Sequence, residues 1–181
     1  RYIEQFFSNL NKAGVNVVTQ ISTDYPADLM HIYDPPLSLY CKGDTSIFNS
    51  RFNIAMVGTR RATNYGKTIS QQIAASLGEN GITVVSGMAR GIDTYSHRGC
   101  LDGKGKTIAV LGCGVDIIYP KENDKLYYEI IDKGGLIISE YIPGVSPMPA
   151  YFPGRNRIIS GMSRGLVVVE AAERSGTSFT V

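Results

Sequence analysis

Short apolar runs alternate with longer stretches of helical periodicity from residue 52 to the end of the chain. The runs are apolar on both faces and rich in β-branched residues, which is typical of parallel strands covered by helices on both sides. Between them, apolar residues recur at helical spacing, as at Ile69, Ile73 and Leu77. Strand then helix, several times over, predicts a doubly wound α/β fold with a mainly parallel sheet. The predicted strands are 54–57, 83–85, 107–111, 136–138 and 166–169, and the predicted helices lie near 69–77, 91–103, 126–130 and from about Arg155 onward.

Residues 1–51 follow a different pattern, and we expect them to form a small N-terminal extension that packs on the main domain, residues 52–181. Apolar side chains at helical spacing between residues 3 and 10 predict a helix. Pro35-Pro36 favours an extended turn ahead of a short alternating strand. The chain begins without Met and stops where a further helix is about to begin, so we expect a fragment of a longer protein.

Charge and cysteine content limit the classes of function. With 18 basic and 16 acidic residues among 181, the formal net charge is +2, so contact with nucleic acid would need a local basic patch. The three cysteines lack CxxC spacing, which gives no indication of a disulfide framework or a zinc site and is typical of thiols in a reducing cytosol. No apolar run approaches the roughly 18 residues of a membrane span. We expect a cytoplasmic protein that uses no metal, cofactor or membrane.

Small and basic residues gather after four of the five predicted strands. Ligands of doubly wound folds bind outside the carboxyl ends of the strands, where small residues let the backbone approach an anion and helix N-termini offer unpaired N–H groups. Arginine adds a two-pronged donor that is always charged. The pattern predicts a phosphate-binding site built from Gly58, Arg60, Lys67, Ser86, Gly87, Arg90, Gly91, Gly112, Lys121, Arg155, Arg157, Ser175, Gly176 and Thr177.

Other chemistries have weaker support in these motifs. Gly58 has no second glycine two residues on, so the dinucleotide fingerprint is missing, and the segment GMARGID lacks the Gly-Lys-Ser/Thr of a phosphate P-loop. His97 stands alone on a predicted helix, where a structural role is the more common one. Asp93, Glu140 and Glu170 could act as acids or bases, but ion pairing that positions arginines is favoured.

Five segments, in order along the chain, resemble motifs of the bacterial DNA-processing protein A family, also called DprA or Smf. They are YPADLMHIYDPPLSLYCKGD, VGTRRATNYG, SGMARGIDTYSH, LGCGVDIIYPKEN and FPGRNRIISGMSRGLVVVEAAERSGT. The resemblance covers nearly the whole chain. It implies a Rossmann-like fold, non-catalytic binding of single-stranded DNA, loading of the RecA recombinase in natural transformation, and a homodimer. It also implies DNA contacts at Arg60, Lys121, Arg155 and Arg157. Gly87, Arg90 and Gly91 would line the mouth of the same DNA-binding pocket.

The chain departs from the family pattern in two respects. Tyr95 and Ser96 stand where small residues are common in the family. A further segment that follows the last helix in the family, and the winged-helix tail of many members, are missing after Val181.

Two other functions stay open at this point. A nucleoside-monophosphate phosphoribohydrolase-like enzyme would share a related architecture, but the turn at 174–177 lacks the double glycine and the following glutamate of those enzymes. A carrier of molybdenum cofactor is a third possibility. Tyr65, Tyr119 and Phe152 lie near the motifs and could stack on bases, although core packing is the favoured role for each.

Overall fold

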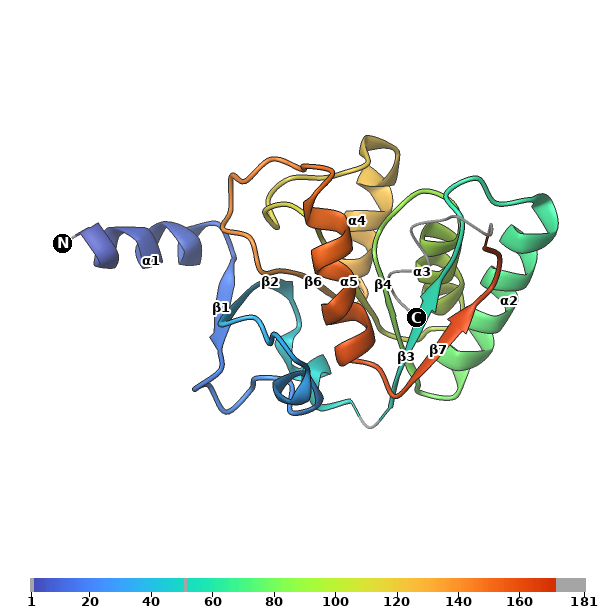
Figure 1. Ribbon diagram of the computed structural model, residues 1–181, viewed down its shortest axis with the longest axis horizontal. Helices are drawn as coiled ribbons and strands as arrows, with labels where there is room; N and C mark the ends of the chain where they lie inside the picture. Colours follow the sequence, from blue (N-terminus) through green and yellow to red (C-terminus); the bar gives the residue numbers. More distant parts are fainter. Residues whose placement is uncertain (1, 51, 172–181) are drawn as a thin grey trace.

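The computed structural model describes residues 2–50 and 52–171, in which helices cover both faces of one sheet (Figure 1). The strands are β1 (Asn16–Thr19), β2 (Ser38–Gly43), β3 (Asn53–Val57), β4 (Thr83–Ser86), β5 (Thr107–Val110), β6 (Leu136–Ser139) and β7 (Gly165–Val168). Their order across the sheet is β1-β2-β6-β5-β4-β3-β7. Strands β3 to β7 pair in parallel, whereas β2 pairs antiparallel with both β1 and β6. The prediction of a doubly wound, Rossmann-like α/β fold is confirmed.

The helices divide between the two faces of the sheet. They are α1 (Tyr2–Lys12), α2 (Asn64–Glu79), α3 (Ile92–Asp102), α4 (Asp124–Asp132) and α5 (Tyr151–Gly161), with short 3₁₀ turns η1 (Asp28–His31), η2 (Thr45–Asn49) and η3 (Lys121–Asn123). Ile158 and Met162 of the α5 region pack on one face, and Leu101 of α3 and Leu126 of α4 pack on the other. Within the described ranges, no helix is both long and apolar enough to cross a membrane.

The N-terminal segment shares the sheet and the core of the main domain. Strand β2 extends the parallel sheet through its antiparallel pairing with β6. Leu29 of η1 and Phe48 of η2 belong to the same apolar cluster as Ile158 of α5. Helix α1 extends away from the rest of the molecule (Figure 1).

Helices α2 and α3 lie side by side at unusually close range. Gly99 permits this approach, because a Cβ atom there would lie 2.2 Å from the carbonyl oxygen of Gln71. The hydroxyls of Ser70 and Ser96 meet at 2.8 Å inside the same contact. This packing fixes the position of the α3 N-terminus relative to α2.

Helix α5 begins at Tyr151, earlier than the prediction of a start near Arg155. The Pro153-Gly154 pair reads as a turn in the sequence. Proline is tolerated in the first turn of a helix, however, because its missing N–H would have no intrahelical partner there. The early start places Phe152 and Arg155 on the same helix, with consequences for the candidate site.

Candidate nucleic-acid interface

A pocket opens where the parallel strands β3, β4 and β5 end. The loops after these strands and the first turn of α5 contribute its lining, which consists of Arg60, Gly87, Ala89, Arg90, Tyr119, Pro120 and Phe152. Three of the predicted phosphate-binding residues, Arg60, Gly87 and Arg90, therefore lie together. Lys121 is exposed and directly follows Pro120 at the pocket.

The ring of Phe152 forms a half-buried aromatic wall of the pocket. The guanidinium carbon of Arg60 lies 5.7 Å from its ring centre, and that of Arg155 lies 6.0 Å from it. Tyr119, 48% exposed, lies beside it with ring centres 5.7 Å apart. Gly112 lets the ring pack on the backbone, since a Cβ atom there would lie 3.0 Å from Phe152. The pocket therefore presents a cationic group and an aromatic surface side by side.

The two arginines that line the pocket differ in their electrostatic surroundings. Arg90 forms an ion pair with Glu122 at 2.5 Å, and both side chains are more than half exposed. Arg60 has no carboxylate within 4 Å among residues 2–50 and 52–171. Of the two lining arginines, Arg60 is therefore the one whose charge is not offset by a described carboxylate.

Internal hydrogen bonds hold the loop 87–91 in place. The Asp93 carboxylate accepts from the backbone N–H groups of Gly87 at 3.2 Å and Ala89 at 3.3 Å. Asn123 donates to the Met88 carbonyl at 2.8 Å. The sequence predicted open amides for phosphate here, and that expectation is wrong for Gly87 and Ala89, because Asp93 already occupies them. The N–H groups of these two residues are therefore not available to an anion in the pocket.

Several predicted site residues shape the loops and do not face the pocket. The buried Ser86 hydroxyl donates to the Met56 carbonyl at 2.6 Å. Gly91, at φ 75°, lies where a Cβ atom would meet the Thr59 carbonyl at 2.3 Å, and Gly58 packs against Ile92. These residues are needed for close packing of the loops after β3 and β4. The predicted turn of Ser175, Gly176 and Thr177 lies outside the described residues.

Arg155 is buried beneath the pocket, with only 4% of its surface exposed. Its Nη1 donates to the Gly87 carbonyl at 2.7 Å and also to the Val110 carbonyl. Burial lowers the pKa of Arg155 to about 10, while nearby Asp93 acts in the opposite direction, so the guanidinium stays charged at neutral pH. The prediction that Arg155 lines the mouth is corrected: it supports the pocket floor.

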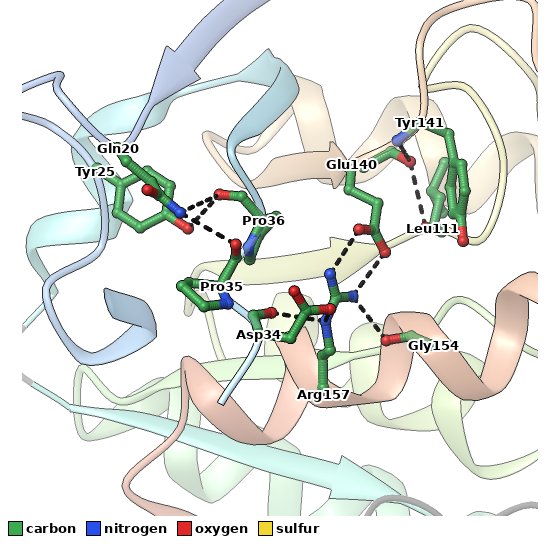
Figure 2. Close-up of polar contacts among 11 residues, drawn as sticks. Gln20, Tyr25, Asp34, Pro35, Pro36, Leu111, Glu140, Tyr141, Gly154 and Arg157 are labelled. Carbon is green, nitrogen blue, oxygen red and sulfur yellow. Dashed lines mark hydrogen bonds and ion pairs between the residues drawn. The ribbon is translucent and has the colours of Figure 1, made fainter. Parts of the chain in front are cut away.

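Arg157 is not among the residues that line the pocket, and its side chain points toward Asp34 and Glu140 (Figure 2). It donates to both carboxylate oxygens of Glu140 at 2.7 Å and to the Asp34 carbonyl at 2.8 Å. Its Nε also lies 3.2 Å from the Asp34 carboxylate. The expectation of a free Arg157 at the mouth is wrong, whereas the prediction that Glu140 positions an arginine is confirmed.

Glu170, at the end of β7, caps helix α2. Its carboxylate accepts from the Thr63 N–H at 3.0 Å and from the Thr63 hydroxyl at 3.2 Å. Carboxylates are stabilised at helix N-termini. The sequence favoured an arginine as the partner of Glu170. The observed partner is the N-terminal end of α2, to which Glu170 supplies an internal anion. Lys67, in the same helix, lies over the ring of Tyr95.

The thiols and carboxylates of the described residues form no metal site. All three cysteines are buried, and burial raises the pKa of the Cys41 thiol to about 12 and those of Cys100 and Cys113 to about 11. Across 2–50 and 52–171, no cluster of three or more His, Cys, Asp or Glu could hold a metal ion.

His97 is fully buried in α3, and its hydrogen bonding defines its tautomer. The Thr107 hydroxyl donates its only proton to the Val84 carbonyl at 2.7 Å. It must therefore accept from His97 Nδ1–H, 2.7 Å away, which leaves Nε2 as a buried acceptor without a partner. Burial first, and the positive charge of Arg155 second, lower the pKa of His97 to about 3.

Because His97 is buried in its neutral form, we expect the fold to lose stability at acidic pH. The folded-state pKa of about 3 lies below the usual 6.5, so the unfolded chain binds the extra proton between these values. Stability contributed by neutral His97 is therefore complete above pH 6.5 and lost as the pH falls toward 3, by about 1.4 kcal/mol per pH unit. We expect urea unfolding of His97→Asn to show a shallower decline between pH 6.5 and 4.5 than the parent. Equal slopes in the two proteins would contradict this role.

Comparison with known proteins decides the family. A model of the family described as DNA recombination-mediator protein A matches residues 16–181. The chain belongs to this family. DprA from Bacillus subtilis is 40% identical over 185 residues, covering 98% of this chain and 62% of the relative. DprA from Streptococcus pneumoniae is 44% identical over 156 residues, covering 86% and 54%. The chain therefore spans between about half and two thirds of the length of these relatives.

Solved structures of the family share the fold. The X-ray structure of DprA from S. pneumoniae matches with a TM-score of 0.86 and 39% identity, covering 99% of this chain and 64% of that one. A structure of DprA from Helicobacter pylori matches with a TM-score of 0.82 and 33% identity, covering 92% and 74%. The latter was described for its single-stranded DNA binding mode.

Sequence reasoning missed the residues that build the pocket from within. Asn123 and Thr94 are buried polar residues joined by a 2.9 Å hydrogen bond, and together they hold the loop 87–91. Asn123 ends the polar turn η3 and Thr94 lies in a helix of mixed polarity, so no local pattern marked either residue as buried. Pro120 and Ala89 contribute only shape to the lining, which no motif indicates.

Proposed function

We propose that this pocket binds single-stranded DNA through its sugar-phosphate backbone and an adjacent base. The observation that carries the proposal is the guanidinium of Arg60, not offset by a described carboxylate, lying against the Phe152 ring in a pocket flanked by exposed Lys121. Arginine and lysine bind phosphate, and aromatic rings stack on bases whatever their identity. The H. pylori relative, described for its single-stranded DNA binding mode, supports the same ligand.

The lining favours binding without sequence preference. Gly87, Ala89 and Pro120 offer no side-chain polar group that could read a base edge. A duplex keeps its bases stacked inside, so the aromatic surface of Tyr119 and Phe152 would contribute only to a single strand. Discrimination between single and double strands then depends on these two rings.

The proposed role is non-catalytic. Among the described residues that line the pocket, none is Asp, Glu, His, Ser or Cys, the residues that commonly supply an acid, a base or a nucleophile. Nothing in the geometry favours the phosphoribohydrolase alternative. The family's name supports a place in recombination, and we infer that the whole protein acts in the cytoplasm as a dimer that protects incoming strands and loads RecA during natural transformation.

A titration of fluorescent oligonucleotides tests the binding proposal. Anisotropy with a single-stranded oligonucleotide and with the matching duplex is expected to show preference for the single strand at equal salt. In parallel, a nucleoside monophosphate is incubated with the protein and analysed for free base, which should not form. Equal affinity for both DNA forms, or release of base, would refute the proposal.

A further inference from the structure

An aromatic residue flanked by two cations lies on the α2–α3 face, outside the pocket. Tyr95 of α3 is half-buried. Lys67 Nζ of α2 lies 5.9 Å from its ring centre, and the guanidinium carbon of Arg98 also lies 5.9 Å from it. Arg98 is exposed, and Lys67 is half-buried. The cluster of Tyr95, Lys67 and Arg98 therefore presents two positive charges around one ring.

The cluster lies beside the pocket. Gly91, four residues before Tyr95, is the N-cap of α3, and a Cβ atom there would lie 2.3 Å from the Thr59 carbonyl oxygen and 2.8 Å from that of Arg60. Four residues of helix correspond to a rise of about 6 Å. Tyr95 thus lies about one helical turn from the loop that carries Arg90, within reach of the next nucleotides of a strand held in the pocket.

No carboxylate among residues 2–50 and 52–171 forms an ion pair with the cations of the cluster. Some other exposed cations have a carboxylate partner, as Lys133 has Glu129 and Arg164 has Asp28. Lys67 and Arg98 have no carboxylate within 4 Å in the described part of the chain. A DNA single strand offers phosphates and base faces in alternation. Cations without a described carboxylate partner, placed around an aromatic ring, are suited to bind both.

We propose that Tyr95, Lys67 and Arg98 form a second contact for the same DNA strand, which rests on the proposed function of the pocket. A base displaces one cation from the ring of Tyr95 and stacks there, while Lys67 and Arg98 bind the flanking phosphates. The strand then runs from the pocket onto the α2–α3 face. Long strands bind more tightly than strands that fill the pocket alone.

Substitution of tyrosine by tryptophan gives a direct reporter, because the chain contains no tryptophan. In Tyr95→Trp, the introduced indole should lose fluorescence as an oligo(dT) of 15 nucleotides is added, in proportion to the anisotropy signal of binding. Tyr128→Trp is the matched control, since Tyr128 is exposed on α4 beside Tyr127, and its fluorescence should stay constant. Quenching in the first variant alone supports the second contact.

Affinity provides the second readout. Tyr95→Ala should weaken binding of the 15-nucleotide strand about 5- to 100-fold, the range for loss of one stacked base, and should hardly affect a strand of about four nucleotides. Thermal melting checks that the variant is folded, and Tyr95→Trp should retain parent affinity. Full binding by Tyr95→Trp without quenching, or parent affinity of folded Tyr95→Ala at both lengths, overturns the inference. Failure of the parent to bind any oligonucleotide overturns the proposed function itself.

Discussion

Replacement of both Arg60 and Lys121 by alanine is expected to weaken single-strand binding by about 100-fold or more. Each side chain is exposed at the pocket and would make a charge-assisted hydrogen bond to a phosphate. Such bonds contribute about 1.5 kcal/mol or more each, so the loss of two corresponds to roughly two orders of magnitude in Kd. Anisotropy titration of a labelled single strand at fixed salt measures the change.

A control with the same loss of charge separates a local effect from a general one. Lys12→Ala with Arg164→Ala also removes two cations, from the end of α1 and from the loop before β7, away from the strand ends that form the pocket. We expect at most a few-fold weakening in that control. Both double variants should melt near the parent temperature, because exposed charges contribute little to stability. Parent-like DNA affinity of the Arg60/Lys121 variant would show that the pocket is misplaced.

Arg155→Met should lower the free energy of unfolding by at least about 3 kcal/mol. This is the typical cost of removing one partner from a buried charged network. The change removes the donor to the Gly87 and Val110 carbonyls and leaves the buried Asp93 without its nearby cation. Burial raises the pKa of Asp93, so this carboxyl already resists ionisation. Urea unfolding monitored by circular dichroism measures the loss.

Arg164→Met serves as the comparison for this prediction. Arg164 is 59% exposed and pairs with Asp28 at 3.3 Å, so its loss should cost less than about 1 kcal/mol. If Arg155→Met unfolded at the parent's urea midpoint, the buried network would not be what supports the pocket floor. The two arginines lie nine residues apart in sequence and differ in burial and in their partners.

The strand positions could be predicted because buried parallel strands leave a simple signature. Each residue of β4, β5 and β6 is buried, so these strands contain no exposed polar position that would interrupt an apolar run. The antiparallel pairing of β2 with β6 could not be predicted in the same way. Register between strands far apart in sequence depends on packing of side chains that no local pattern records.

The candidate site was predicted in part for a similar reason. Arg60 and Arg90 follow strands, and parallel strand ends meet at one edge of the sheet, so their convergence followed from the topology. Arg155 and Arg157 lie in α5, where two residues correspond to about 200° of rotation. One side chain therefore turns under the pocket and the other toward Glu140. A helix beginning near Arg155 already implies this rotation, but the prediction from the sequence did not apply it to the two arginines.

The salt dependence of binding tests the central claim most directly, because it counts phosphates held by cations. Oligonucleotide affinity should be measured across a series of salt concentrations for the parent and for the Arg60→Ala, Lys121→Ala double variant. We predict that log Kd of the parent rises with log salt with a slope of about 1.4 or more, two phosphates at about 0.7 each, and that the slope falls by about 1.4 in the variant. A parent affinity that does not change with salt, or an equal slope in the variant, would contradict a cationic pocket that holds the strand.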